Sequence, residues 1–438
     1  MDIEGYARRH INDPDLIEKL AERIMEFKDV DESYARKLAE AVVLEVRNAY
    51  SKTSFLLDYH RTGVTMGKFG VGSRGTGDFY VHSKIAEMCG EAVVSSRDLD
   101  DAGVVKVGDY YVSVAIDGIH SRLSEFPFIA GFHVTRAAMR DVLVMGSSPI
   151  ALFSDIHIAD DGDVSKIFDH LAGITAVSEL TGVPLIAGST LRIGGDMVIG
   201  ERMTGAVGCV GVSRHITPRR DAREGDVIIL TEGAGGGTVA TTAIYYGMHE
   251  VVEETINLDF IFAARSIIES EAVKKVHAMS DVTNGGIRGD AEEISRASKT
   301  ALYFDVGKIR RLINRRVLEM LEELEIDFMG VSIDSLMVIC PEEHAEEILE
   351  RIRSSGVEAD VVGWVEKGSG AFSVDGDRIE PLRPKFRESA YTPVKKMVGE
   401  DKPEDFDEMR RRVDEAFEKA LEKKRRVVER LKREIPPG

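Results

Sequence analysis

Two stretches of this chain alternate strand-like and helix-like runs, and this repeated alternation limits the possible folds more than any other feature. From about Gly63 to Val212, β-branched runs such as YYVSVAI and PIALFSDIHI alternate with helical runs such as FIAGFHVTRAAMRDVLVMG. A second alternation extends from about Gly225 to Leu382, with strands such as DVIILTEG and DSLMVIC. Such runs bury their apolar faces when helices pack on sheets. The sequence therefore predicts an α/β (α+β) protein with two tandem units.

Helices are expected outside these units at both ends of the chain. Between Pro14 and Tyr50, two runs place apolar residues at helical spacing and predict an added helical cap. The charged run after Pro403 carries a narrow apolar stripe and predicts a docking or coiled-coil helix, and less strongly a partner-binding helix. The expected domains are a helical extension at 1–60, α/β domains at 61–215 and 216–390, and a charged helix at 391–438.

Composition excludes several classes of protein. With 438 residues, 43% of them hydrophobic, the chain is long enough for large cores. A net charge of -19 argues against a nucleic-acid partner, because such proteins gather Lys and Arg on one face. No apolar run approaches the roughly 18 residues of a membrane span, and the opening MDIEGYARRH does not resemble a signal peptide, so a cytoplasmic protein is expected. Cys89, Cys209 and Cys340 are far apart, which predicts buried free thiols.

A glycine-rich segment precedes the first expected helix of the first α/β unit. Its repeated glycines permit positive φ and expose backbone N–H groups, while basic and hydroxyl side chains lie among them, as in a phosphate-binding loop. The spacing does not match a Walker A motif. A flexible surface loop is the alternative. The residues that would form the phosphate site are Lys68, Gly70, Gly72, Ser73, Arg74 and Gly75.

Acidic residues occur where a buried strand or helix normally carries none. Asp100 and Asp101 lie beside small residues, and Asp117 ends the strand run VAIDG. Bringing such acids together is unfavourable unless a cation or protonation relieves their repulsion, and Mg²⁺ would do so. Acids in surface turns are the alternative. Asp141 lies in a largely apolar helix and either pairs with a cation such as Arg140 or faces the same metal.

The second α/β unit contains a similar pattern. In SDVTNGGIRGD, Asp281 ends a strand run and is followed by Asn284, Gly285 and Gly286 before a helix that carries Asp290. A glycine-rich turn at a helix N-terminus is typical of an anion site. Taken alone, the pattern is also compatible with a simple helix entry.

Four stretches together resemble the aminoimidazole ribonucleotide synthetase (PurM-like) superfamily, which includes selenophosphate synthetase, thiamine monophosphate kinase and the hydrogenase maturation factor HypE. The matching stretches are DDAGVV, VAIDG, RDVLVMGSSPI and SDVTNGG, in the family's order and after a glycine-rich loop. The resemblance covers roughly residues 61 to 385. It is specific to the superfamily and not to one member.

The resemblance implies an ATP-dependent phosphoryl-transfer enzyme that works as a homodimer and acts on a small-molecule acceptor. Mg²⁺ and ATP would be held by Asp100, Asp101, Asp117, Asp141 and Asp281, with the glycine-rich loops at the phosphates. Lys68 and Arg74 would supply positive charge, because such transfer depends on positioning and charge neutralisation. The activity would be that of a ligase, a cyclo-ligase or a small-molecule kinase.

Two departures from the family pattern bear on activity. Arg140 replaces an Asn before the helical acid, and Ser189 stands where several relatives carry an acid or a histidine. A working enzyme would then recruit another carboxylate, either Asp196 on a glycine-flexed segment or Glu201. The alternative is a nucleotide-binding scaffold or regulatory subunit without turnover. The chain also lacks the C-terminal cysteine of the hydrogenase factor and the loop cysteine or selenocysteine of selenophosphate synthetases.

Overall fold

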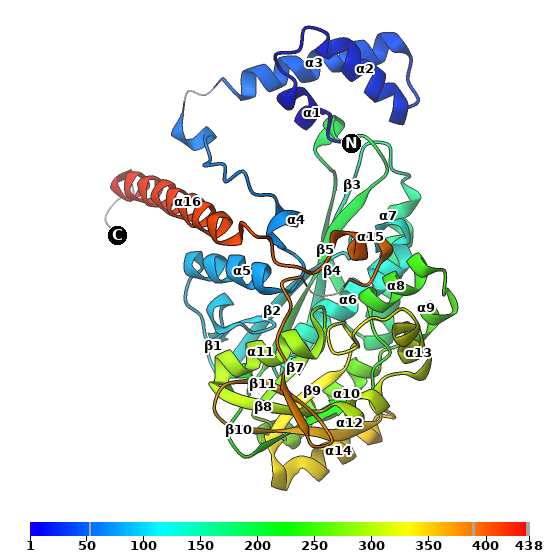
Figure 1. The fold of residues 1–438 in the computed structure, drawn as a ribbon, viewed down its shortest axis with the longest axis vertical. Coiled ribbons are helices and arrows are strands. Elements are labelled where there is room, and N and C mark those ends of the chain that lie inside the picture. The colour runs from blue at the N-terminus through cyan, green and yellow to red at the C-terminus, as the bar shows by residue number, and fades with distance from the viewer. Residues whose placement is uncertain (52–53, 388–389, 435–438) are drawn as a thin grey trace.

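The computed structural model describes residues 1–51, 54–387 and 390–434. Two β-sheets with packed helices form the main body, and a helical unit stands at the N-terminal end (Figure 1). The expected α/β class and its two tandem units are confirmed. Within the described part of the chain, no helix combines the length and apolar character that a membrane span requires.

The N-terminal unit has a small apolar core of its own. Ile3 and Ile24 are fully buried in it, because apolar residues recur at helical spacing and face inward. Lys28 forms ion pairs with Asp160 and Asp161, which fix this unit to the loop after β3. The helices are α1 (Ile3–Arg9), α2 (Leu16–Phe27) and α3 (Glu32–Ala49).

The first sheet contains five strands in the order β1-β2-β5-β3-β4. All neighbours are antiparallel except β3 and β4. Two long helices, α6 (Pro127–Val144) and α7 (Ser165–Thr181), pack together, and α6 lies on the sheet. The strands are β1 (Gly103–Val107), β2 (Tyr110–Gly118), β3 (Ser148–Ile158), β4 (Leu185–Arg192) and β5 (Met203–Ser213).

The two faces of this sheet differ in exposure. Along β2, Ser113 and Ala115 are buried on the face covered by α6, whereas Val114 and Ile116 are exposed on the other face. This alternation is the period of two expected for a strand with one covered face. The outer face consequently carries exposed apolar side chains, among them Val105, Val107, Val114, Ile116 and Leu191.

The second sheet contains seven strands in the order β12-β11-β8-β10-β6-β9-β7. The strands are β6 (Asp226–Thr231), β7 (Ala278–Asp281), β8 (Thr300–Asp305), β9 (Leu336–Pro341), β10 (Ala359–Lys367), β11 (Gly370–Asp375) and β12 (Arg378–Pro381). The helices are α8 (Gly237–Tyr246), α9 (Glu250–Glu254), α10 (Asp259–Ile268), α11 (Gly286–Ser298), α12 (Val306–Leu312), α13 (Arg315–Glu323) and α14 (Ala345–Ser354).

The two units share one apolar interior. Met139 and Phe132 of α6 belong to the same buried cluster as Phe260 and Ile261 of α10, and α10 packs against both α6 and α14. Residues of α6 are therefore fixed between the two sheets. This position of α6 places its acidic residue, Asp141, between the two units.

The C-terminal helix packs against the glycine-rich segment of the first unit. The ring centroids of Phe406 and Phe69 lie 5.0 Å apart, those of Phe406 and Phe386 lie 4.9 Å apart, and Met409 is buried beside them. The stripe predicted for this helix thus contacts its own chain. The elements involved are α4 (Met66–Phe69), α5 (Thr76–Met88) and α16 (Phe406–Glu434), and α15 (Pro393–Val398) precedes α16 in the chain.

Candidate functional site

Three carboxylates from separate elements meet between the two sheets. One oxygen each of Asp101, Asp141 and Asp281 lies within 4.8 Å of the others. Asp281 ends β7, Asp141 lies within α6, and Asp101 precedes β1. Asp117 on β2 acts on the same group electrostatically, since it raises the pKa of Asp141. The structure therefore brings together the acids that were predicted from separate stretches of sequence.

The electrostatics of this cluster are unfavourable without a cation. Burial raises the pKa of Asp101 and Asp141 well above the ordinary value, and it raises the pKa of Asp100 to about 6. Asp281, Asp117 and Asp101 raise the pKa of Asp141 further. Among the described residues, none forms an ion pair or hydrogen bond with the Asp141 carboxylate. Carboxylate oxygens at this spacing fit a hard divalent cation such as Mg²⁺.

Arg140 does not pair with Asp141, which was one of the two alternatives for that acid. Its guanidinium lies 3.3 Å from Asp281 and also pairs with Asp334, which Arg136 contacts from the same helix. The arginine that departs from the family pattern therefore partly compensates one acid of the cluster. The buried oxygen Asp281 Oδ2 nevertheless has no hydrogen-bond partner among the residues that the structure describes.

The two glycine-rich segments lie against each other. Arg74 donates to the carbonyl oxygen of Asn284 at 3.0 Å, and a Cβ at Gly285 would lie 3.1 Å from the Arg74 Cβ. Gly72 and Arg74 donate backbone N–H groups to buried Asp78 at 2.9 Å each, which holds the loop. The predicted residues Gly70, Gly72, Ser73, Arg74 and Gly75 thus belong to a loop that closes on Asn284, Gly285 and Gly286.

Arg219 is the central residue that sequence reasoning missed. Its buried guanidinium donates to Asp101 at 2.7 Å, to Glu293 at 2.7 Å and to Asp290 at 3.2 Å. Its backbone N–H donates to Asp100 at 3.0 Å. Burial raises the pKa of Asp290 to about 7, although Arg219 and Arg74 oppose the shift. The Asp100 carboxylate thus accepts a hydrogen bond from Arg219, whereas the Asp101 carboxylate both contacts Arg219 and belongs to the group with Asp141 and Asp281.

The structure leaves two predicted catalytic residues outside this site. Lys68 pairs with Asp405 at 2.7 Å and its side chain is 52% exposed. Asp196 pairs with Arg192 near the N-terminal unit and its side chain is 61% exposed. Within a single chain, neither approaches the acid cluster. Ser189 lies opposite Asp155 on the edge strand β4.

A second group of polar residues lies near the N-terminal end of α8. His120, just after β2, contacts the Tyr391 hydroxyl at 2.7 Å and the Thr241 hydroxyl at 3.1 Å. Lys395 lies 4.1 Å from the centroid of the Tyr391 ring. Burial lowers the pKa of His120 to about 4 and that of Lys395 to about 8. Only contacts between distant segments reveal this group, and no sequence motif indicated it.

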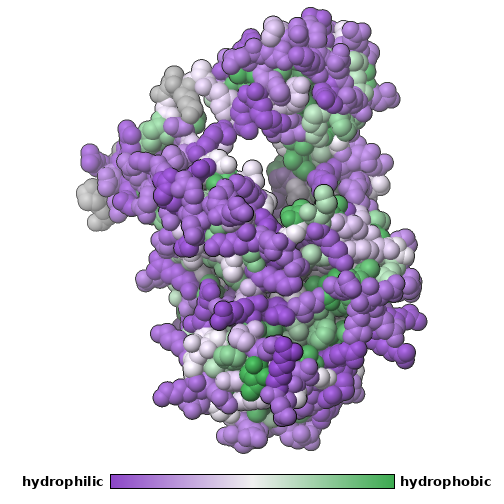
Figure 2. Space-filling model, viewed as in Figure 1, coloured by the Kyte–Doolittle hydropathy of each residue, from purple (hydrophilic) through white to green (hydrophobic). Residues whose placement is uncertain are grey.

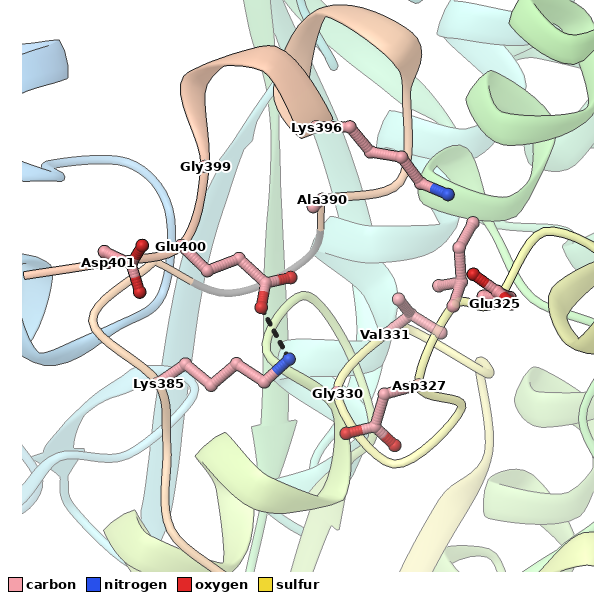
Figure 3. A pocket seen from close by; sticks show the side chains of 11 residues that line it. Glu325, Asp327, Gly330, Val331, Lys385, Ala390, Lys396, Gly399, Glu400 and Asp401 are labelled. Atoms are coloured by element: carbon pink, nitrogen blue, oxygen red, sulfur yellow. Dashed lines mark hydrogen bonds and ion pairs between the residues drawn. The ribbon is translucent and has the colours of Figure 1, made fainter.

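A cavity of about 410 Å³ lies between the 325–331 loop and the C-terminal segment (Figure 3). Lys385 and Glu400 form an ion pair of 2.6 Å across part of it. The loop approaches the second glycine-rich segment closely, since a Cβ at Gly286 would lie 2.5 Å from the Met329 carbonyl oxygen. The lining mixes both signs of charge, so it does not select one class of ligand.

Comparison with known proteins places this chain in one family. The model for the AIR synthase related protein N-terminal domain matches residues 99–213, and that for the C-terminal domain matches residues 223–375. The chain therefore belongs to the AIR synthase related, PurM-like proteins. A Methanocaldococcus jannaschii protein, "Uncharacterized protein MJ1416", is 54% identical over 450 residues, covering 99% of this chain and 98% of its own.

More distant relatives have named activities. The selenide, water dikinase of Myxococcus xanthus is 23% identical, covering 65% of this chain and 88% of its own. The thiamine-monophosphate kinase of Pyrococcus horikoshii is also 23% identical, covering 65% and 87%. Among solved structures, HypE in its complex with HypF aligns with a TM-score of 0.57 at 16% identity, covering 69% of this chain and 99% of that one. This last likeness shows the fold alone.

Proposed function

We propose that this protein transfers a phosphoryl group from Mg²⁺-bound ATP to a small-molecule acceptor. The observation that carries the proposal is the group formed by Asp101, Asp141 and Asp281, of which Asp281 is buried and the other two are half-buried, with too little positive charge around them. The relatives of this protein support phosphoryl transfer from ATP, because two are named as kinases and solved structures of others contain ATP or AMPPCP.

Each part of the site has a role in this proposal. Asp101, Asp141 and Asp281, with Asp117 nearby, would hold the metal ion, which neutralises phosphate charge when bound. Arg74 and the backbone N–H groups of the two glycine-rich loops would bind phosphate oxygens, because a guanidinium and oriented N–H groups match that geometry. Arg219 would orient Asp101 through its 2.7 Å hydrogen bond. The protein thus supplies positioning and charge neutralisation.

The acceptor would approach from the side of His120. That residue follows Asp117 by three positions, just after β2, and a Cβ at Gly237, at the start of α8, would lie 3.6 Å from the His120 Cβ. The three residues His120, Tyr391 and Lys395 combine the first unit with the C-terminal segment. An amide, carbonyl or other small acceptor that accepts hydrogen bonds fits such a set of donors.

We also propose a homodimer formed through the outer face of the first sheet. Val114 and Ile116 are 43% and 64% exposed, and further apolar side chains lie beside them on neighbouring strands. A continuous apolar face of this kind marks an interaction surface, and self-association covers it. Ile116→Glu is expected to give monomers in sedimentation, whereas Val164→Glu, on an exposed turn, is the control. A parent protein that remains monomeric at micromolar concentration contradicts the dimer.

A cytoplasmic location is part of the same proposal. All three cysteines are free; Cys209 and Cys340 are buried as expected, while Cys89 is half-buried. Free thiols without disulfides are typical of a reducing compartment. The test exposes the protein to the oxidising conditions of a periplasm. If disulfides form and the protein keeps its activity, this result contradicts a cytoplasmic location.

The scaffold alternative has one specific observation in its favour. Arg140 lies 3.3 Å from Asp281 and competes with a metal for that carboxylate. The deciding experiment incubates the protein with Mg²⁺-ATP and a panel of amide, amine, hydroxyl and phosphate acceptors and measures ADP release. Acceptor-dependent ADP release that disappears in Asp141→Asn supports the enzyme. Binding of ATP without turnover for every acceptor supports the scaffold.

A further inference from the structure

A cavity of about 540 Å³ lies at the junction between the N-terminal helical unit and the linker to the glycine-rich segment. The ends of α1 and α3 form two of its walls, and the linker contributes one side chain. The visible surface of this helical unit is mostly hydrophilic (Figure 2). The cavity is lined by Arg8, Arg9, Ile11, Val46, Arg47, Tyr50, Ser51 and Arg61.

No acidic side chain among the lining residues balances the positive charge of this cavity. Four of its residues are arginines and none is acidic, although the chain has a net charge of -19. Within the described ranges, the side chains of Arg9, Arg47 and Arg61 form no ion pair, while Arg8 donates to the Tyr50 hydroxyl at 2.7 Å. Elsewhere on the same helical unit, arginines are matched by acids: Arg23 pairs with Glu26 and Arg36 with Glu18.

Helix dipoles account for only part of this positive charge. Arg9 and Arg47 lie in the last turns of α1 and α3, where a cation is favourable. Each helix end carries about half a negative charge, so two ends balance about one of the four cations. Arg61 belongs to no helix and still lines the same cavity.

We propose that this cavity binds a phosphate-bearing small molecule. Guanidinium groups form paired hydrogen bonds with phosphate oxygens, and several together bind one phosphate firmly. Tyr50, Ile11 and Val46 provide an aromatic and aliphatic wall for the remainder of the ligand. A ligand held there connects α1 and α3 to Arg61, five residues before Met66 of the glycine-rich segment. The site is separate from the acid cluster, so it does not depend on the proposed reaction.

The test is calorimetric titration of the full chain with pyrophosphate in the presence of EDTA. Without a divalent cation the acid cluster repels this anion. The titration therefore measures binding to the arginine cavity separately from binding to the proposed active site. One saturable site is expected in the parent. The double variant Arg9→Ala/Arg47→Ala is expected to bind about tenfold more weakly or worse, because two charged hydrogen-bonding groups are lost. Arg23→Ala, on the same helical unit, is the matched control and should bind as the parent does.

Two results overturn the proposal. One is the absence of saturable pyrophosphate binding in the parent, and the other is equal affinity in the parent and the double variant. If the double variant has a lowered melting temperature, Arg61→Ala replaces it as the test variant, since this linker side chain is exposed. Arg61→Ala is likewise expected to weaken pyrophosphate binding. Unchanged affinity in Arg61→Ala likewise contradicts the proposal.

Discussion

Arg219 and Asp101 are 118 residues apart in the chain, yet the guanidinium of one donates a 2.7 Å hydrogen bond to the carboxylate of the other. The same guanidinium contacts Asp290 and Glu293 on α11. Arg219 therefore connects the acidic segment before β1 to the second unit. Its side chain is 2% exposed, so water does not screen these contacts.

Replacing Arg219 is expected to destabilise the protein strongly. Arg219→Met leaves Asp101, Asp290 and Glu293 buried without their main cation, a change that costs about 3–5 kcal/mol in comparable buried pairs. The measurement is the free energy of unfolding by denaturant titration. The neighbouring Arg220 pairs with Asp98 and is partly exposed, so Arg220→Met should cost no more than about 1 kcal/mol. Similar losses in both variants contradict a central role for Arg219.

The contact between α16 and the glycine-rich segment is expected to affect nucleotide binding. Phe406 is buried against Phe69. Phe406→Ala removes that contact, and replacing a fully buried Phe by Ala lowers the free energy of unfolding by about 3–5 kcal/mol. The expected result is faster proteolysis near residues 66–75 and weaker ATP binding. Leu431→Ala, at an exposed position of the same helix, is the control. Unchanged proteolysis and ATP affinity in Phe406→Ala mean that the helix does not position the loop.

Lys395 is expected to give the protein a distinctive stability at alkaline pH. Its pKa in the folded protein is about 8, below the ordinary 10.5, because burial and Arg122 disfavour the charged form. The unfolded chain therefore binds more protons between these two values, and stability from this group rises as pH increases through that range. At most about 3.5 kcal/mol is involved, since a pKa difference of one corresponds to about 1.4 kcal/mol.

The measurement compares the free energy of unfolding of the parent and of Lys395→Met at pH 7.5 and pH 10. The parent should gain stability relative to the variant as the pH rises. A constant difference between the two proteins shows that Lys395 titrates normally. His120 does not interfere in this range, because its pKa of about 4 keeps it neutral at both values.

The sequence was sufficient for the fold and for identifying the acids that lie together in the structure. Alternating strand and helix runs identify both sheets because each run has one dominant periodicity. Asp101 and Asp141 were found because charged residues are rare among buried apolar neighbours, and Asp281 because it ends a strand run before a glycine-rich turn. The structure brings these three together. Both the periodicity of a strand or helix and an acid at an unusual position can be recognised within a short stretch of sequence.

The partners of those acids could not be predicted in the same way. Arg219 lies in TPRRDAREG, which has the composition of a surface loop, and its burial follows from the approach of α11, β7 and the segment before β1. Asp196 was proposed because it is close to Ser189 in sequence, but β4 directs it toward the N-terminal unit, where it pairs with Arg192. His120, Tyr391 and Lys395 come from segments whose proximity is a tertiary property.

The most direct test of the central claim is a titration of Mg²⁺-ATP against the parent, Asp141→Asn and Asp196→Asn. If Asp101, Asp141 and Asp281 hold the metal, Asp141→Asn should weaken binding by about 1.5–3 kcal/mol, the range for contacts of charged groups. Omitting Mg²⁺ should weaken binding to the parent more than to this variant. Asp196→Asn, at an exposed ion pair outside the cluster, should bind as the parent does. Equal Mg²⁺-ATP affinity in the parent and Asp141→Asn contradicts the assignment of this cluster as the metal-nucleotide site.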